Sequence, residues 1–340
     1  MKRVLIIGAG GFIGGFMARK SLERGYETWV AVRETTSRRY LDDNRLKFVV
    51  VDYDSKDTVA ATLSGALPDG EKWDWIVYNL GATKVMNYSD FNRINYGYLK
   101  NVVEALCDTG MVPERFLYMS SLSALGPGDE KNYSPYTSSM IPDPNTRYGV
   151  SKIKAETLLE MTSGFPWIIF RPTGVYGPHE QDYLMMIKCI DKHWDFGVGY
   201  RKQLLTFIYV EDLVNAVFDA LERSPLHRKY IISEDRAYTQ KEFRKIVSRV
   251  QGKKFVIPVR LPLWIVGIVS VIAEKYGIAK LKPSTLNTDK FKIMKQRNWN
   301  ADISAAREGF GFNPEYSLEQ GIRITVDEYR KSLQKTDKNG

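Results

Sequence analysis

The chain of 340 residues is predicted to form an α/β fold, a doubly wound parallel sheet followed by a smaller C-terminal α/β lobe. Short apolar runs alternate with amphipathic, helix-like segments through the first half, which is typical of parallel strands joined by helices. A glycine-rich turn follows the first apolar run directly. After residue 174 the alternation of strand-like and helix-like segments becomes irregular, and the loops are rich in proline and glycine. A second lobe is therefore expected there.

The first predicted strand, residues 3–7, leads into the glycine-rich turn and then into a helix-like segment that ends at Gly25. This strand, turn and helix context is the one in which a glycine motif binds a dinucleotide. Gly8 permits the tight turn, Gly11 lets the backbone approach a pyrophosphate, and Gly14 lets the helix pack closely on the strand. The helix N-terminus would then face the phosphate charge. The sequence therefore predicts a Rossmann-type sheet, and a glycine-rich turn without a ligand is the alternative.

The end of the second predicted strand, residues 27–32, bears on the choice of nicotinamide cofactor. In an NAD site an acidic residue usually closes this strand and binds the ribose hydroxyls. Here Val32 holds that place, and Arg33 and Arg38 follow. Guanidinium groups suit a 2′-phosphate, so we expect NADP(H) to be preferred. NAD(H) stays possible, because Glu34 could bind the ribose if the strand ran two residues longer, and Arg33 could be an ordinary surface arginine.

Four more apolar runs predict the remaining strands of this sheet, at residues 47–51, 75–78, 115–119 and 167–170. Ligands of doubly wound sheets bind beyond the carboxyl ends of the strands. Polar side chains follow three of these runs, namely Asp52, Asn79 and the pair Ser120 and Ser121. Asp52 could accept a hydrogen bond from an adenine amino group, or it could simply stabilise a turn.

Tyr148 and Lys152 stand four residues apart at the start of a helix-like run. A helix places positions i and i+4 on one face, so the Lys152 ammonium can lie beside the Tyr148 phenol. A nearby positive charge favours the phenolate, and it would lower the pKa of Tyr148 from its ordinary value of about 10 toward a range useful for proton transfer. The alternative is a solvated helix face, because such pairs also arise by chance.

Composition excludes several classes of protein. Two cysteines make a disulfide framework implausible, and no cluster with metal-ligand spacing accompanies the three histidines, so we expect no metal site. The formal net charge is +9, but the basic residues are widely spread and no nucleic-acid-binding motif is present. We therefore expect anionic small molecules rather than nucleic acid as partners. The N-terminus does not resemble a signal peptide, which favours a cytoplasmic setting.

Residues 261–273 form an uncharged run of thirteen residues. A membrane span needs about 20 residues, so we expect no transmembrane segment. We predict a buried helix of the second lobe; a wall of an apolar substrate pocket and a patch that touches lipid are the alternatives. The tail, residues 336–340, is predicted to be disordered.

Several ordered motifs together resemble one large family of enzymes. They are the turn with Gly8, Gly11 and Gly14; Asp52; Asn95 in Arg-Ile-Asn-Tyr-Gly; the serine strand that starts at Phe116; Tyr148 and Lys152; Arg-Pro-Thr-Gly-Val-Tyr-Gly-Pro at 171–178; Tyr-Val-Glu-Asp-Leu at 209–213; and the closing pattern from Ala305 to Gly321. In these motifs the chain resembles the extended short-chain dehydrogenase/reductase superfamily, also called the NAD-dependent epimerase/dehydratase family. The resemblance covers nearly the whole chain.

The resemblance implies a role for each matching residue. Tyr148 would be the general acid/base, and Lys152 would lower its pKa and bind the nicotinamide ribose. Ser121 would hydrogen-bond the substrate oxygen, with Ser120 and Ser123 as rivals for that role. Asn95 would hold the local structure and a proton-relay water.

The predicted ligand contacts form two sets. The predicted cofactor-binding residues are Gly8, Gly11, Phe12, Ile13, Gly14, Arg33, Arg38, Asp52, Tyr53, Leu80, Gly81, Ala82, Asn95, Met119, Tyr148, Lys152, Pro172, Thr173 and Val175. The predicted substrate contacts are Lys84, Ser123 and Tyr176. The cofactor domain would comprise residues 1–174 and about 206–232, and the substrate lobe about 175–205 and 233–335. Helices near 88–106 and 148–161 would pair with a second copy in a homodimer.

Departures from the family pattern narrow the expected reaction. Leu122 and Ser123 stand where sugar-nucleotide dehydratases carry an Asp-Glu pair, and Leu205 stands where epimerases carry a diphosphate-binding arginine, although Arg201 and Lys202 lie close enough to substitute. The pattern is most similar to reductases of the dihydroflavonol-reductase and 3β-hydroxysteroid-dehydrogenase type. We therefore expect an NADP(H)-dependent oxidoreductase acting on a moderately apolar ketone or alcohol. A nucleotide-sugar epimerase is the first alternative, and a dinucleotide-sensing module without catalysis is the second.

Overall fold

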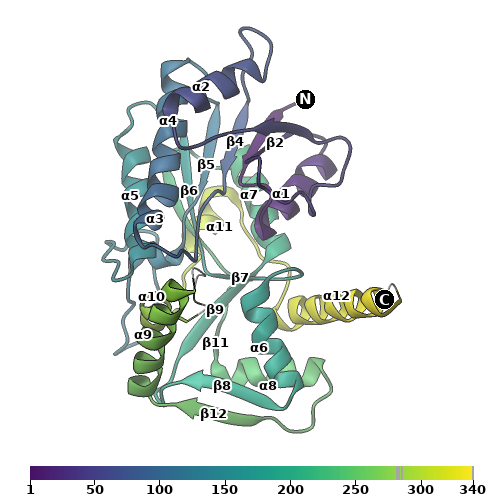
Figure 1. Ribbon diagram of the computed structural model, residues 1–340, viewed down its shortest axis with the longest axis vertical. Coiled ribbons are helices and arrows are strands. Elements are labelled where there is room, and N and C mark those ends of the chain that lie inside the picture. Colours follow the sequence, from purple (N-terminus) through teal and green to yellow (C-terminus); the bar gives the residue numbers. More distant parts are fainter. Residues whose placement is uncertain (281–283, 285, 339–340) are drawn as a thin grey trace.

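A seven-stranded parallel sheet forms the upper half of the molecule (Figure 1). The computed structural model describes residues 1–280, 284 and 286–338. The strand order is β10-β6-β5-β4-β1-β2-β3, and every neighbouring pair is parallel. This confirms the predicted Rossmann-type α/β sheet. The strands are β1 (Arg3–Ile7), β2 (Glu27–Val32), β3 (Lys47–Val50), β4 (Trp75–Tyr78), β5 (Arg115–Met119), β6 (Trp167–Pro172) and β10 (Arg228–Ile232).

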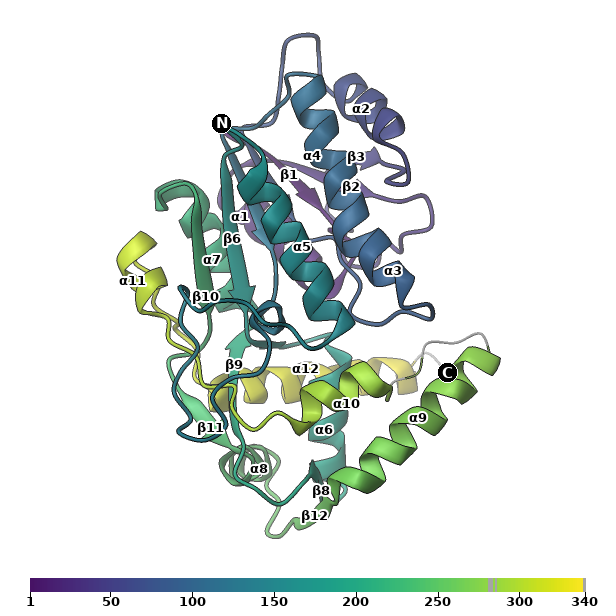
Figure 2. The same ribbon diagram turned by 90° about the vertical axis from the view of Figure 1, so that its left-hand side faces the viewer.

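Helices cover both faces of this sheet, which explains why its central strands are apolar along their whole length (Figure 2). One face packs on α1 (Phe12–Glu23), α7 (Val210–Arg223) and α11 (Ser304–Phe310). The other face packs on α2 (Lys56–Gly65), α4 (Tyr98–Asp108) and α5 (Arg147–Met161).

A helical stretch that we predicted over residues 88–106 is present but not uniform. It consists of α3 (Ser89–Asn92), a π-helical turn η1 (Arg93–Gly97) and α4. A π-turn inserts an extra residue into a helix and often lies at a functional site. Here it carries the predicted site residue Asn95, whose side chain is fully buried.

Smaller sheets and several helices make up the lower half of the molecule (Figure 1). The three-stranded sheet has the order β11-β9-β7, and β12 pairs with β8 in a two-stranded parallel sheet. The strands are β7 (Gly174–Tyr176), β8 (Trp194–Val198), β9 (Leu204–Tyr209), β11 (Ala237–Thr239) and β12 (Ile257–Leu261). The helices are η2 (Leu122–Leu125, a 3₁₀ turn that follows β5), α6 (Gln181–Asp191), α8 (Gln240–Val250), α9 (Leu263–Ala279), α10 (Thr288–Lys295) and α12 (Leu318–Lys338). The residue boundaries predicted for two lobes remain a prediction.

Two expectations from the sequence are wrong. Residues 261–273 lie mostly in α9, which is helical as predicted but not buried: Trp264 is 68% exposed and Ile272 is 61% exposed. The tail was expected to be disordered from residue 336, yet α12 continues through Lys338; residues 339–340 lie outside the described part of the chain. Within the described part of the chain, no helix combines the length and apolar character needed to cross a membrane.

Candidate active site

The glycine-rich turn connects β1 to α1 and leaves little room for side chains. Gly8 has a φ of +85°, and a Cβ added there would lie 2.6 Å from the Leu80 backbone nitrogen. A Cβ on Gly14 would collide with the Gly8 carbonyl oxygen. A Cβ on Gly11, which precedes the first helical residue Phe12, would lie 3.7 Å from the Gly8 carbonyl oxygen, an ordinary contact, and no side chain caps the helix. Uncapped N–H groups at a helix start favour an anion, so the turn fits a pyrophosphate.

The loop that follows β4 lies against this turn and is tied to α5 by Asn95. The Asn95 Oδ1 accepts a hydrogen bond from the Ala82 backbone N–H at 2.7 Å, and its Nδ2 donates to the Ala82 carbonyl at 3.1 Å. The same Nδ2 donates to the Ser151 hydroxyl at 2.9 Å. Gly81 sits so close to α5 that a Cβ there would lie 3.1 Å from the Lys152 Nζ. The predicted residues of the turn, the loop and α5 are therefore neighbours.

Tyr148 lies in the first turn of α5 and shares a hydrogen bond with Ser121 at the end of β5. The Ser121 Oγ also accepts a hydrogen bond from the Ser123 backbone N–H at 3.2 Å, which orients the hydroxyl. The Tyr148 ring packs 5.9 Å from the Phe91 ring. Two of the three predicted catalytic side chains thus meet directly, and Ser123 contributes its backbone to this arrangement.

Lys152 lies one turn further along α5 and is buried. Its Nζ donates to the Met119 carbonyl at 2.8 Å and lies 6.0 Å from the centre of the Tyr148 ring. Burial lowers the pKa of Lys152 to about 8, against the opposing effect of the Glu156 carboxylate. Burial raises the pKa of Tyr148, and the hydrogen bond from Ser121 offsets only part of this. Our expectation of a lowered Tyr148 pKa is therefore wrong for this arrangement, because loss of hydration disfavours the phenolate.

The predicted ribose end of the site lies around the end of β2. The strand ends at Val32, so Glu34 does not extend it. Arg33 is exposed, and its backbone N–H donates to the Thr36 hydroxyl at 3.0 Å. The guanidinium of Arg38 lies over the Phe48 ring at 4.6 Å. Both arginines lie in the loop that follows β2.

Asp52 and Tyr53 follow β3. The Asp52 carboxylate is exposed and accepts a hydrogen bond from the Asp54 backbone N–H at 3.0 Å, which is turn chemistry. The Tyr53 ring is buried and packs 5.8 Å from the Tyr98 ring, while its hydroxyl has no hydrogen-bond partner among the described residues. These contacts leave the exposed Asp52 carboxylate able to accept a hydrogen bond from an adenine amino group.

Residues after β6 were also predicted to contact the ligands. Pro172 closes β6, and the Thr173 backbone N–H donates to the Ile232 carbonyl at 3.1 Å. Val175 lies partly buried in β7. Tyr176 is 1% exposed and packs on Phe207 in the core, and its role as a substrate contact stays a prediction.

Lys84 belongs to a cluster of charges that joins the two halves of the molecule. Its Nζ lies 2.6 Å from one oxygen of Asp182 in α6, and Lys290 of α10 lies 3.1 Å from the other. Sequence reasoning missed Asp182 and Lys290, because nothing local to either residue indicates this pairing. Lys84 is held at the boundary between the halves by this contact.

Asp289 of α10 caps the helix that carries Tyr148, and sequence reasoning missed it as well. Its Oδ2 accepts hydrogen bonds from the backbone N–H groups of Arg147 at 2.8 Å and Tyr148 at 3.3 Å. Thr146, the N-cap residue, accepts from the Gly149 N–H at 3.0 Å. A carboxylate at a helix N-terminus is favourable because of the orphan N–H groups and the helix dipole. The lower half of the molecule thus positions the first turn of α5.

A buried ion pair lies beneath the site. The Arg171 guanidinium of β6 binds the Glu156 carboxylate of α5 at 2.6 Å, and both side chains are essentially inaccessible to solvent. The Ser120 hydroxyl donates to the same carboxylate. Tyr148, Lys152 and Glu156 are spaced by four residues, so they lie on one helix face. That spacing was visible in the sequence, whereas the pairing of Glu156 with Arg171 was not.

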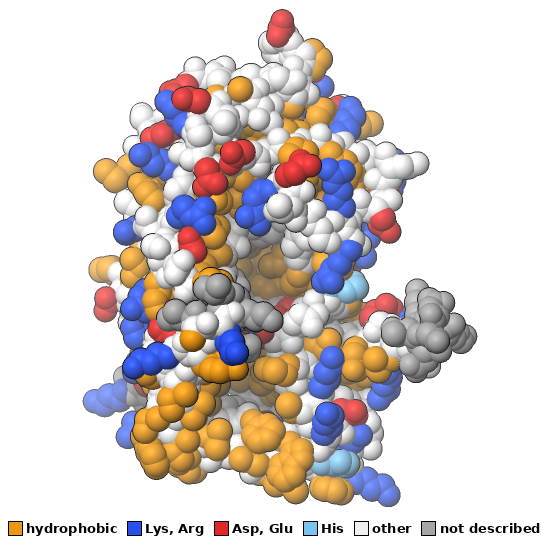
Figure 3. Space-filling model, in the orientation of Figure 1, with side chains coloured by type: hydrophobic (Ala, Val, Ile, Leu, Met, Phe, Trp, Pro, Cys, Tyr) orange, Lys and Arg blue, Asp and Glu red, His pale blue; other side chains and the backbone are white. Residues whose placement is uncertain are grey.

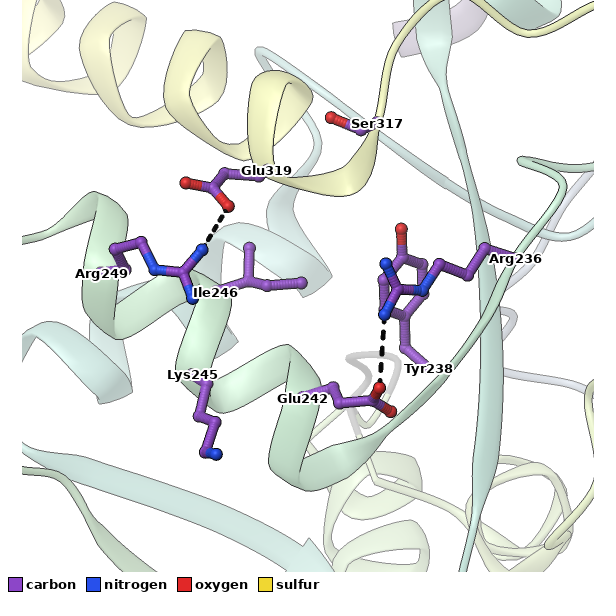
Figure 4. Close-up of a pocket in the computed structure, with 8 residues that line it drawn as sticks. All are labelled: Arg236, Tyr238, Glu242, Lys245, Ile246, Arg249, Ser317 and Glu319. Atoms are coloured by element: carbon purple, nitrogen blue, oxygen red, sulfur yellow. Dashed lines mark hydrogen bonds and ion pairs between the residues drawn. The ribbon is translucent and has the colours of Figure 1, made fainter.

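A surface cavity lies elsewhere, in the lower half of the molecule (Figure 4). It measures about 360 Å³ and lies between α8, β11 and the start of α12. Its charged side chains are paired: Arg236 lies 3.4 Å from Glu242, and Arg249 lies 2.7 Å from Glu319. None of the predicted site residues lines it. In the described part of the chain, no group of three or more His, Cys, Asp or Glu could hold a metal ion.

Comparison with known families identifies the family of this chain. The sequence profile of the NAD dependent epimerase/dehydratase family matches residues 4–233. Since this match covers most of the chain, the protein belongs to the NAD dependent epimerase/dehydratase family, which is a family of enzymes.

Individual relatives are distant. The chain is 24% identical to a ceramide reductase of Caulobacter vibrioides over 96% of this chain and 94% of that protein. It is 22% identical to 3beta-hydroxysteroid-dehydrogenase/decarboxylase isoform 3 of Arabidopsis thaliana over 99% of this chain, but it spans only 63% of that protein's length. The crystal structure of a UDP-glucose 4-epimerase of Thermotoga maritima has the same fold, with a TM-score of 0.76 and 20% identity over 97% of this chain and 99% of that chain.

The buried ion pair yields a test of what holds the site together. Replacing Glu156→Gln leaves Arg171 as a buried, uncompensated cation, so we expect the free energy of unfolding to fall by about 3–5 kcal/mol. Glu160→Gln is the matched control on the same helix, because Glu160 pairs with Lys229 at the surface and should cost about 1 kcal/mol or less. Urea unfolding followed by circular dichroism measures both. Equal losses for the two variants would contradict the central role of the buried pair.

Proposed function

We propose that the protein is an NADP(H)-dependent oxidoreductase that interconverts a ketone and a secondary alcohol on a moderately apolar small molecule. The observation that carries this proposal is the Tyr148 phenol, hydrogen-bonded to Ser121 and one helical turn from Lys152, at the carboxyl edge of the sheet. The glycine-rich turn fits a dinucleotide, because Gly8 and Gly14 leave no room for side chains and α1 begins without a cap.

The chemistry follows from the arrangement of the residues. Bound NADPH would supply a hydride to the carbonyl carbon. Negative charge then develops on the substrate oxygen, and the hydroxyls of Tyr148 and Ser121 can donate hydrogen bonds to it. Tyr148 then transfers its proton to that oxygen and completes the alcohol. A raised pKa keeps this phenol protonated at neutral pH, which suits the direction of ketone reduction.

Lys152 would act in two ways. Its Nζ is fixed by the Met119 carbonyl beside the glycine of the β4 loop, close enough to bind a ribose hydroxyl of a dinucleotide on the turn. While protonated, it would also stabilise the phenolate that Tyr148 becomes after transferring its proton. Asn95 would be a positioning residue, because its side-chain hydrogen bonds all go to Ala82 and Ser151.

Two observations support the proposal of an apolar substrate. A hollow between the two halves has hydrophobic side chains on its walls (Figure 3). In addition, two relatives are named as a ceramide reductase and a 3β-hydroxysteroid dehydrogenase, and both names describe oxidation or reduction of a largely apolar molecule. Leu122 and Ser123 offer no carboxylate for the elimination step of a dehydratase.

A nucleotide-sugar epimerase is the alternative, because it would use the same Ser121, Tyr148 and Lys152 for transient oxidation and re-reduction. Arg201 and Lys202, exposed just before β9, are the cations that could bind a diphosphate. Against this, Leu205 in β9 is apolar and packs on the core. The two proposals differ in stoichiometry: the reductase consumes one NADPH for each substrate, whereas an epimerase consumes none.

We also propose a homodimer in which the outer faces of the stretch from α3 to α4 and of α5 pair with a second copy. Val150 and Met161 are the large apolar side chains exposed on α5. On α4, which would lie in the same interface, the charged side chains of Lys100 and Glu104 form an ion pair within the helix. Sedimentation at micromolar concentration decides between monomer and dimer.

Removing the phenol tests the mechanism. Tyr148→Phe should lower turnover of an apolar ketone by about 10²–10⁴-fold, because the proton donor is lost. Binding of NADPH should persist, because no hydrogen bond of the Tyr148 hydroxyl shapes the glycine turn. Tyr200→Phe, at an exposed tyrosine, is the control and should keep full activity. Turnover by Tyr148→Phe at the rate of the unmodified protein would remove Tyr148 from the mechanism.

The pKa of Lys152 predicts the pH dependence. Its folded-state pKa of about 8 lies below the ordinary value of 10.5, so the ammonium is charged below pH 8 and neutral above it. We expect kcat/KM for ketone reduction to fall as the pH rises through about 8, while the Tyr148 phenol stays protonated. Lys152→Arg should shift this fall to higher pH, since a guanidinium keeps its charge. A profile that stays flat across pH 8 would contradict a role for this cation.

Substitution of an arginine in the loop after β2 tests whether the protein prefers NADP(H) or NAD(H). We expect NADPH to raise the melting temperature more than NADH at equal concentration, because stabilisation follows affinity. Arg33→Ala should weaken NADPH binding about tenfold or more and leave NADH binding unchanged, because only the 2′-phosphate needs the guanidinium. Arg45→Ala is the matched control, since Arg45 lies in the same loop and pairs with Asp43. Equal stabilisation by both cofactors would speak for NAD(H).

A further inference from the structure

The lower lobe exposes a broad apolar surface formed by α9 and the strand pair β8–β12. In Figure 3, hydrophobic side chains gather over these elements at the bottom of the molecule, with Lys and Arg side chains around them. We define the apolar face by six exposed residues, Trp194, Phe196, Ile257, Trp264, Ile268 and Ile272. Monomeric soluble proteins rarely expose contiguous apolar surface on this scale without a function for it.

Helix α9 is apolar on both sides, although only one side is covered. Val266 and Ser270 point inward and are buried, and Gly267 lies in contact with Phe291 of α10. Trp264, Ile268 and Ile272 follow at intervals of four residues, so they form a line on the outer side. A helix that is hydrophobic all round is normally buried. Half of this one faces outward instead.

The strand pair is inverted relative to an ordinary surface sheet. Its register places Ile257 beside Trp194, and these side chains are exposed together with Phe196. The opposite face carries the charge: Asp195 is buried there and binds Arg260 at 2.8 Å and Arg244 at 3.3 Å. A sheet with one face exposed to solvent normally has its polar side chains on that face. Here the polar side chains are on the buried face, which indicates that the exposed face contacts an apolar phase.

The rim of the apolar face is positively charged. Lys192, Lys254, Lys275 and Lys280 are exposed, and none of them takes part in an ion pair among the described residues. The carboxylate of Asp191, next to Lys192 in the chain, pairs with Lys253 at 2.9 Å. The nearby Glu274 is only partly exposed and accepts a hydrogen bond from the Thr288 backbone N–H at 2.9 Å. An apolar centre with tryptophans and a lysine rim is the pattern that binds an anionic lipid surface.

We propose that the apolar face docks on a membrane that contains anionic lipids, with α9 lying in the plane of the headgroups and the rim lysines on lipid phosphates. A second copy of the chain is a poorer occupant, because a two-fold contact would bring the same unpaired lysines of both copies together. Trp194 and Trp264 would occupy the interfacial depth that tryptophan prefers. This inference stands independently of the proposed reaction.

Docking would also place lipid against a helix that is connected to the candidate active site through α10. Helix α9 packs on α10, and Asp289 of α10 caps the helix that carries Tyr148. Helix α10 therefore contacts both the docked helix α9 and the helix that carries Tyr148.

Vesicle binding of the full chain tests the proposal. We expect the protein to float with vesicles of phosphatidylcholine and phosphatidylglycerol, to bind pure phosphatidylcholine vesicles weakly, and to lose binding in high salt. The double variant I268E/I272E should bind anionic vesicles at least about tenfold more weakly. The control I141E/L333E replaces apolar residues that are 85% and 47% exposed elsewhere, and it should bind normally. K275E/K280E should weaken anionic binding about tenfold or more.

Circular dichroism verifies that each variant is folded, which is expected because every replaced side chain is exposed. Three outcomes would overturn the proposal: no binding of the unmodified chain to anionic vesicles, equal binding by I268E/I272E, or dimerisation in solution that this variant abolishes without any vesicle binding. The last outcome would assign the apolar face to a second copy. Failure of the Tyr148→Phe test leaves these measurements unaffected, so the two proposals fail separately.

Discussion

The buried face of α5 is the constraint on which the site depends. Tyr148, Lys152 and Glu156 occupy three successive turns, and each is fixed from a different side. Ser121 holds the phenol, the Met119 carbonyl holds the ammonium, and Arg171 neutralises the carboxylate. Because these anchors come from β5, β6 and their loops, the sheet sets the position of the helix along its whole length. A helix held so firmly can present two ionisable side chains with defined geometry.

Burial of these groups has consequences for charge. An ammonium removed from water loses hydration, so its pKa falls, and a phenol in the same place becomes harder to ionise. Both shifts favour the uncharged form of the side chain: the raised pKa keeps the Tyr148 phenol protonated near neutral pH, and the pKa of about 8 lets the Lys152 ammonium lose its charge slightly above neutral pH. The Glu156 carboxylate, one turn below Lys152, limits the fall of the lysine pKa.

The lower half of the molecule both completes the site and exposes an unusual surface. Its α10 supplies the cap of α5 through Asp289, and Asp182 of α6 joins Lys84 of the upper half to Lys290. Polar groups thus concentrate at the boundary between the halves, where they organise the site. The apolar side chains of β8, β12 and α9 face outward at the far end. This distribution makes the lower lobe a link between the site and whatever meets that surface.

The sequence alone determined the parallel sheet, the glycine turn, the placement of Tyr148 and Lys152 on one helix face, and the end of β2 at Val32. Each depends on local spacing: an apolar run for a buried strand, glycine where no Cβ fits, and four residues for one helical turn. Tertiary structure decided what depends on distant partners. It paired Glu156 with Arg171, capped α5 with Asp289, buried Tyr176 in the core, raised the pKa of Tyr148 and left α9 half exposed. Burial and ion pairing are set by residues far apart in the chain, so no local pattern could have revealed them.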